Sequence, residues 1–161
     1  MSTLRIELPE QMSARGMTPR SRVLKMEITE HEAEVAGRLR LPAGSKIVKI
    51  ERLRESSEEP LALETCYLPA KEFAGLMRVP LEKVSLFVAL QQKYGMDLAY
   101  ADEEVDATAA ETGVADLLAV PPGTSLLRIR QVIYSTSGKA IMYVVGFYRS
   151  ECHSLYIRRF R

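Results

Sequence analysis

The sequence contains no tryptophan and few of the residues that hold metals or carry out redox chemistry. Its 161 residues include two cysteines and two histidines. Cys66 and Cys152 each stand alone, without the Cys-x-x-Cys spacing of zinc and redox sites, and His31 and His153 form no His-Glu-x-x-His pattern. The sequence therefore predicts no metal site and no cofactor. It favours a cytoplasmic, reducing compartment, with Cys66 in the core.

An excess of charge of one sign and a long hydrophobic run are also missing. Lysine and arginine number 22 against 21 aspartates and glutamates, which gives a net charge of +1. This balance argues against the basic surface of a nucleic-acid binder. No run approaches the roughly 20 apolar residues of a membrane helix. Residues 1–11 lack the apolar stretch of a signal peptide. We therefore expect no membrane partner.

The motifs of several common catalytic sites are absent as well. The sequence has no Gly-x-Ser-x-Gly, no phosphate-binding P-loop and no Gly-x-Gly-x-x-Gly. Nothing in it requires an enzyme. What is present is 47% hydrophobic residues over 161 positions, enough for one compact domain with a sizeable core.

The first part of the chain predicts one strand and one capped helix after a short polar segment. Glu10–Gly16 is compatible with one or two helical turns, and Val23–Ile28 is strand-like. Thr29, followed three residues later by Glu32, has the spacing of a capping box, so we expect a helix to begin there. That helix should end at Pro42-Ala43-Gly44.

The rest of the chain predicts two hairpins and two further helices. The segment between Pro69 and Pro80 is typical of a short helix, and Ser85 opens a second one that runs to Tyr94-Gly95. Strands connected by hairpins, with short helices between them, indicate an α+β fold with a mainly antiparallel sheet and short flanking helices. The strand-like segments are Lys46–Glu55, Leu61–Leu68, Met96–Ala107, Ser125–Ser135, Lys139–Tyr148 and Ser154–Phe160.

The second half of the chain resembles the first. A shift of 79 residues places Thr29–Ser56 on Thr108–Ser135 with nine identities in 28 positions. Each copy predicts a capped helix, a Pro-Gly turn and a hairpin. Any two capped helices followed by hairpins share part of this pattern, but the number of identities favours a structural repeat.

Two arginines and a carboxylate are expected together on the inward face of the first hairpin. Strand alternation puts Arg52 and Arg54 on the same face as Val48 and Ile50, and a five-residue turn would place Glu64 opposite Arg52. Two guanidinium groups on a partly buried face need a compensating anion, and their planar donors suit a phosphate or carboxylate. The alternative is a solvated strand face with a surface salt bridge, worth about 0–1 kcal/mol.

The two copies differ at these positions. At an offset of 79 residues, the counterparts of the two arginines and the glutamate are Gln131, Ile133 and Tyr143. The first copy therefore gathers charges that the second lacks, and both the anion site and the solvated strand face stay open as explanations of this difference.

Other polar positions carry weaker signals. Ser85 begins a helix, where its hydroxyl and the first free backbone N–H groups can receive an anion, although N-capping is an alternative reason for a serine there. Glu103, Glu104 and Asp106 are typical of a solvated acidic edge. No residue is predicted to be catalytic.

Several short motifs, spread over most of the chain, match one known family. They are Met12-x-x-Arg15-Gly16-Met17-x-Pro19, Leu41-Pro42-x-Gly44, Ile50-x-Arg52-x-Arg54, Pro60-x-x-x-Glu64-Thr65-x-Tyr67-Leu68-Pro69, Ser85, Leu126-Leu127-Arg128-Ile129-Arg130, Tyr134-x-x-x-Gly138 and Tyr148-Arg149. The series resembles the effector-sensing UTRA domain of GntR-type bacterial transcription regulators, in the HutC subfamily. After the last motif the chain departs from the family pattern, because Glu151-Cys152-His153 replaces the usual Asp-Arg-Tyr run.

The resemblance implies a fold similar to chorismate lyase and a small-molecule effector that is anionic. Such effectors are often sugar phosphates or carboxylated metabolites. The resemblance assigns the anionic group to Arg52, Arg54 and Ser85. It assigns the polar body of the effector to Glu64 and Tyr148, and the wall of the pocket to Phe87.

The resemblance also implies an assembly larger than this chain. GntR-type regulators are homodimers that bind DNA through a winged helix-turn-helix domain, and this sequence shows no such domain. We therefore expect a homodimer in which residues 1–9 are a linker stump, residues 10–161 form the sensing domain and DNA is bound only through a linked domain. Two alternatives stay open: a chorismate lyase-like enzyme with Glu64 as acid or base, and a dimerisation module with a vestigial pocket.

Overall fold

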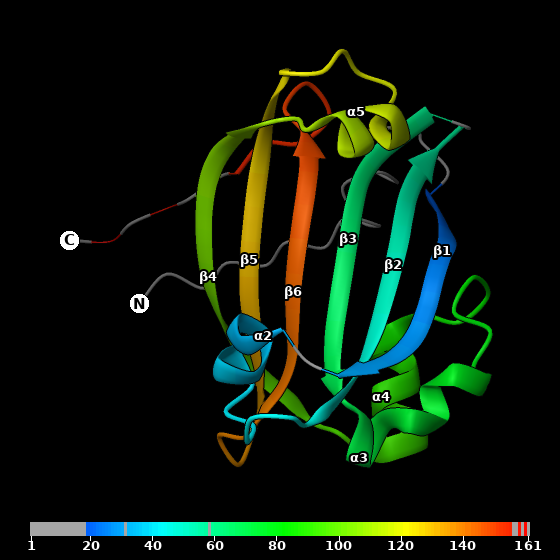
Figure 1. Cartoon of the computed structure of the whole chain (residues 1–161), viewed down its shortest axis with the longest axis vertical. Helices are drawn as coiled ribbons and strands as arrows, with labels where there is room; N and C mark the ends of the chain where they lie inside the picture. Colours follow the sequence, from blue (N-terminus) through cyan, green and yellow to red (C-terminus); the bar gives the residue numbers. More distant parts are fainter. Residues whose placement is uncertain (1–18, 31, 58, 156–157, 159, 161) are drawn as a thin grey trace.

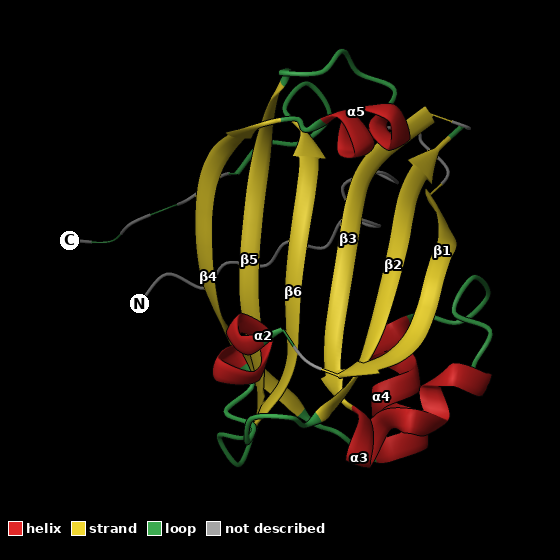
Figure 2. Cartoon of the chain, viewed as in Figure 1, coloured by secondary structure: helices red, strands yellow, loops and turns green. Residues whose placement is uncertain are grey.

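The computed structural model describes residues 19–30, 32–57, 59–155, 158 and 160. Its centre is a six-stranded antiparallel sheet with the strand order β1-β2-β3-β6-β5-β4 (Figures 1 and 2). The predicted α+β class is confirmed. The strands are β1 (Pro19–Glu30), β2 (Lys46–Ser56), β3 (Glu59–Pro69), β4 (Leu98–Ala109), β5 (Ser125–Ser135) and β6 (Ala140–Arg149). The helices are α2 (Ala33–Arg38), α3 (Ala70–Phe73), the 3-10 helix η1 (Ala74–Arg78), α4 (Leu86–Tyr94) and α5 (Thr112–Leu118).

The predicted repeat is confirmed. Strand, short helix and hairpin follow each other as β1-α2-β2-β3 and again as β4-α5-β5-β6. β1 and β4 have the same length and lie 79 residues apart in the sequence, as do β2 and β5. The strand order reads the same outward from the β3–β6 seam in both directions, so the two halves are related by an approximate two-fold axis through the centre of the sheet.

Each half places its short helix on the strands of the other half. In Figure 1, α2 lies in front of one end of β5 and β6, and α5 lies in front of the opposite end of β3 and β2. Leu39, which follows α2, packs with Val132 and Tyr143 of the second half. Leu118 of α5 packs with Leu53 and Leu63 of the first half. This exchange binds the halves into one body.

The other face of the sheet carries the larger core and the remaining helices. Side chains that alternate along the strands point to this face, among them Ile50, Cys66 and Val144, and they pack against α3, η1 and α4. Phe73 and Leu90 of these helices are fully buried. The helices cover one end of the face, and the arginines predicted to bind an anion lie on the strands towards its other end. None of the helices in the described residues is long and apolar enough to cross a membrane.

Two sequence predictions are wrong at element boundaries. Thr29 does not cap a helix, because β1 continues through Glu30 and the Thr29 hydroxyl donates to the Glu30 carbonyl. α2 begins after Glu32, whose side chain makes no capping hydrogen bond. The expected last strand is also missing: Ser154, Leu155, Arg158 and Phe160, the described residues of that segment, are not in a strand. The predicted helical turns at residues 10–16 and the linker at residues 1–9 lie outside the described residues.

Candidate functional site

Strand pairing places the predicted site residues on one face of the sheet in two adjacent rows. In the first row, Arg52 of β2 lies opposite Glu64 of β3, which lies opposite Gly146 of β6. In the second row, Arg54 lies opposite Ala62, which lies opposite Tyr148. The first-hairpin register predicted from the sequence is therefore confirmed. We call Arg52, Arg54, Glu64 and Tyr148 the arginine site.

The arginine site is buried. Only 4% of the surface of Arg52 is exposed, 9% of Glu64 and 6% of Tyr148, and the Arg54 side chain is 15% exposed. The alternative of a solvated strand face with a surface salt bridge is therefore wrong. Charged groups at this depth lose most of their hydration and need partners inside the protein or in a ligand.

The two guanidinium groups share one carboxylate at long distance. Arg52 Nη2 lies 4.0 Å from one oxygen of Glu64, and Arg54 Nε lies 4.0 Å from the other. These separations give an ion pair but exceed hydrogen-bond length. Arg52 Nη2 donates to Cys66 Sγ at 3.6 Å, a weak acceptor. The Nε atoms of Arg52 and Arg54 are buried and have no hydrogen-bond acceptor within the described residues.

The surroundings of the arginine site shift the pKa values of Arg52, Cys66 and Tyr148. Burial works against the charged form of Arg52, but the neighbouring Cys66 and Glu64 outweigh it and raise the pKa of Arg52 above its ordinary value. Burial raises the pKa of the Cys66 thiol, which keeps it neutral. Burial and the nearby Glu64 carboxylate raise the pKa of the Tyr148 hydroxyl well above its ordinary value. The site therefore offers positive charge and donors.

His153 completes this region and was not predicted. It follows β6, is 5% exposed, and its ring stacks on Tyr148 with ring centroids 4.6 Å apart. Arg149 holds the turn between them, since it donates to the Pro60 carbonyl at 3.0 Å and to the carboxylate of Glu151 at 2.9 Å. No pattern in the sequence signals this contact, because it depends on how the chain turns after its last strand.

Ser85 and Phe87 lie at the start of α4. Ser85 occupies the N-cap position, as the sequence predicts, but its hydroxyl makes no capping hydrogen bond. Leu86, between them, is fully buried in the same cluster as Cys66, which brings the first turn of α4 to the face of the arginine site. Phe87 is 48% exposed. Within the described residues, no hydrogen bond or ion pair joins either residue to the arginines, and their place in the site stays a prediction.

The second half lacks an arginine site, as the sequence predicts. One of the three residues that the sequence repeat assigns as counterparts of the site differs in the structure. Gln131 and Ile133 occupy the positions equivalent to the two arginines. Gln131 pairs with Val144 of β6. Val144, and not Tyr143, is therefore the structural counterpart of Glu64. The second hairpin has a longer turn, between Ser135 and Ala140, and this turn shifts the register of β6 by one residue relative to the sequence repeat.

Comparison with known families identifies the chain. A family model described as UTRA domain matches residues 14–154. The chain belongs to the UTRA domain family. The resemblance noted in the sequence is thus confirmed over most of its length.

The relatives of this UTRA domain are bacterial transcription regulators. It is 29% identical to the HTH-type transcriptional repressor NagR of Bacillus subtilis over 142 residues, which are 88% of this chain and 58% of NagR. It is 26% identical to the ligand-binding domain of a Bordetella bronchiseptica protein assigned to the GntR family of transcriptional regulators, with a TM-score of 0.81 over 89% of this chain and 90% of that one. PhnF from Mycobacterium smegmatis shares the fold, with a TM-score of 0.86 at 21% identity over 94% of this chain and 67% of PhnF. The chain spans little more than half the length of the curated relatives it matches.

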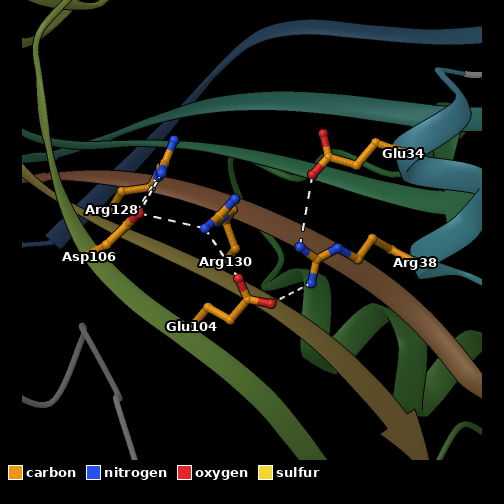
Figure 3. A network of polar contacts seen from close by, with 6 residues as sticks. All are labelled: Glu34, Arg38, Glu104, Asp106, Arg128 and Arg130. Atoms are coloured by element: carbon orange, nitrogen blue, oxygen red, sulfur yellow. Dashed lines mark hydrogen bonds and ion pairs between the residues drawn. The ribbon is translucent and has the colours of Figure 1, made fainter.

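The opposite face of the UTRA domain carries a network of ion pairs across the second half (Figure 3). Arg38 of α2 donates to Glu104 of β4 at 2.7 Å, and Arg130 lies 3.2 Å from the other oxygen of Glu104. Arg128 Nε donates to Asp106 at 2.8 Å. The hydrogen bond from Arg38 lowers the pKa of Glu104, and the one from Arg128 lowers that of Asp106. The predicted solvated acidic edge is therefore only partly correct: Glu104 is exposed, but Glu103 and Asp106 are half-buried, and Glu104 and Asp106 are paired with arginines.

A cavity of about 210 Å³ also lies on this opposite face. Glu27, Glu32, Lys49 and Tyr67 are among the residues that line it. None of the predicted ligand-binding residues does. In the described part of the chain, no three His, Cys, Asp or Glu side chains gather in an arrangement that would hold a metal ion.

Proposed function

We propose that this UTRA domain binds an anionic small molecule at the arginine site and thereby controls a linked DNA-binding domain. The observation that supports this most strongly is the charge balance of the site. Two buried guanidinium groups share one carboxylate at 4.0 Å, and their Nε donors have no acceptor within the described residues. An anion that enters here would gain hydrogen bonds without displacing existing ones.

The chemistry of the site favours a phosphate or carboxylate as the anionic group. Guanidinium donors form paired hydrogen bonds with the oxygens of either group. Glu64 would then accept from hydroxyl groups on the body of the molecule, and the protonated Tyr148 hydroxyl would accept from this body while it donates to the anionic group. A sugar phosphate or a carboxylated metabolite fits this combination. Ser85 would add a donor, and Phe87 would cover the apolar side.

The proposal that this domain controls DNA binding rests on the regulators to which it is similar. NagR is named as an HTH-type transcriptional repressor, and this chain matches a little more than half of it. In a full regulator of the HutC type, a homodimer would carry a winged helix-turn-helix domain on each UTRA domain. Effector binding can shift DNA binding only by its difference in affinity between the two arrangements of the dimer.

A thermal-shift screen of the domain tests the ligand. The panel consists of sugar phosphates, free sugars and small organic acids. A ligand at about 100 times its dissociation constant stabilises by roughly 2.7 kcal/mol, which for a domain of this size raises Tm by about 5–10 °C. The repeat offers a matched variant, Arg52→Gln/Arg54→Ile/Glu64→Val, whose new residues already occupy the equivalent positions of the second half.

A shift with phosphorylated or carboxylated compounds that vanishes in this triple variant supports the proposal. Arg128→Gln, which removes an arginine from the opposite face, should leave the shift intact. A shift that survives the triple variant would place the effector elsewhere. If no compound of the panel raises Tm, a dimerisation module is favoured. Consumption of chorismate would favour an enzyme.

A further inference from the structure

Gly146 stands at the centre of β6, directly opposite Glu64, and Tyr148 follows it two positions later on the same face. A side-chain carbon placed on Gly146 would lie 2.5 Å from Cε2 of Tyr148, 2.7 Å from its hydroxyl oxygen and 2.9 Å from Cζ. Real side-chain carbons do not come this close to other atoms. The outer end of the Tyr148 ring therefore occupies the space that a side chain at position 146 would need.

Backbone conformation does not explain a glycine at this position. Gly44, Gly95, Gly123 and Gly138 adopt positive φ angles, whereas Gly146 does not. A glycine inside a strand is normally unfavourable, because it adds conformational entropy to the unfolded chain and contributes no packing. At Gly146 the reason for glycine is space for the neighbouring ring.

This arrangement brings the Tyr148 hydroxyl back along the strand into the row of Glu64. The ring also stacks on His153, and it is 6% exposed. The charges of both Glu64 and Arg54 influence the pKa of its hydroxyl. A ring that pointed straight up from its own row would not reach back over Gly146.

We infer that Gly146 is a positioning residue of the arginine site: by leaving room for the Tyr148 ring, it holds the Tyr148 hydroxyl beside Glu64, where a bound anion would meet it. The role in binding rests on the proposed function. The position of the ring does not, so the two can be tested separately.

A double-mutant cycle in urea tests the position of the ring without any ligand. Gly146→Ala should lower the unfolding midpoint strongly when Tyr148 is present and only slightly in a Tyr148→Ala background, because the clash is then gone. Gly113→Ala is the control without a clash, since nothing lies within 4 Å of its added carbon and its φ is not positive; in helix α5 the alanine should raise the unfolding midpoint. An equal loss in both backgrounds would overturn the inference, because the alanine would then act on the sheet and not on the ring.

Spectrophotometric titration of the tyrosines gives a second readout. In the wild type, the buried Tyr148 ionises well above the usual pH. Gly146→Ala should expel the ring, so that one more tyrosine ionises near pH 10. The extra tyrosine should be absent in Gly146→Ala/Tyr148→Phe. An unchanged titration in Gly146→Ala would contradict the inference, since the ring would still be buried.

Binding of inorganic phosphate, measured by calorimetry, tests the functional part. Gly146→Ala should weaken phosphate binding by about fivefold or more, the effect of one lost hydrogen bond, and should have no effect in the Tyr148→Ala background. If Gly146→Ala destabilises the domain only when Tyr148 is present, yet binds phosphate as tightly as the wild type, the role of the ring in binding is overturned. If the wild type binds neither phosphate nor any compound of the panel, the proposed function fails, while the urea cycle and the titration still decide the role of Gly146.

Discussion

Glu64 lies between two buried arginines, and its carboxylate is the partner that the described structure provides for both. Glu64→Val should therefore lower the free energy of unfolding by about 3–5 kcal/mol, because it leaves two guanidinium groups buried without a counter-charge. Urea denaturation measures this loss.

The triple variant Arg52→Gln/Arg54→Ile/Glu64→Val is the control for this prediction. It removes the charges together and should recover most of the stability, since replacing a whole buried ionic group by neutral residues is often neutral or favourable. If Glu64→Val is as stable as the wild type, the arginines have another partner.

Glu103 gives a residue-scale prediction about pH. It lies on β4 opposite Gln131, on the same face as Cys66, and partial burial raises its pKa above the ordinary 4.5. Its ionised form therefore destabilises the fold above the raised pKa, and this cost disappears as the pH falls below 4.5. Glu103→Gln should raise Tm at pH 7, and the gain should vanish near pH 4. Thermal unfolding across this pH range measures it.

The neighbouring Glu104 is the control, because its hydrogen bond to Arg38 lowers its pKa. It stabilises the fold at neutral pH and loses this effect as the pH falls through its lowered pKa. Glu104→Gln should therefore lower Tm at pH 7. If both variants change Tm in the same direction, burial is not what raises the pKa of Glu103.

The charged part of the arginine site could be predicted from the sequence, and the rest could not. Arg52, Arg54 and Glu64 belong to one hairpin, so strand alternation and local pairing are enough to bring them together. Gly146 meets Glu64 only through the pairing of β3 with β6, which joins distant parts of the chain. The contact of His153 with Tyr148 depends on a turn after β6 that no local pattern indicates.

At the scale of single elements, α5 begins without a capping side chain. Its N-cap residue, Glu111, has an extended backbone and makes no side-chain cap hydrogen bond. A shorter carboxylate fits this position better, so Glu111→Asp should stabilise the domain by about 0.5–1 kcal/mol in urea denaturation. Glu111→Gln keeps the length of the native side chain and should give no gain. A gain of equal size in both variants would show that removing the native glutamate, and not capping by a shorter carboxylate, stabilises the domain.

The sequence predicted most elements but failed where tertiary contacts decide their ends. The hairpins were correct because turn residues separate clear strand patterns. Thr29 and Glu32 have capping-box spacing, yet β1 extends through Thr29 because the strand pairs with Ile47 there. Residues 154–160 have strand-like composition, but a strand also needs a partner edge, and the described residues of this segment pair with none.

At the scale of the whole molecule, the exchanged helices predict that neither half unfolds alone. Leu39 and Leu118 are equivalent in the repeat, both are almost fully buried, and each packs on strands of the other half. Each Leu→Ala substitution should cost about 2–5 kcal/mol. Circular dichroism and tyrosine fluorescence should report a single shared urea transition in both variants. Two separate transitions in either variant would show that the halves are independent.

The β3–β6 seam also affects how the chain folds. Residues 62–67 pair with residues 143–148, so the centre of the sheet closes only after most of the chain is available. Contacts so distant in sequence slow folding, because a long loop must be ordered before they form. During synthesis, the emerging first half presents the open edge of β3 and the apolar side of Leu39 before their partners exist. This is the interval in which a nascent chain of this fold is most exposed to aggregation and to chaperone capture.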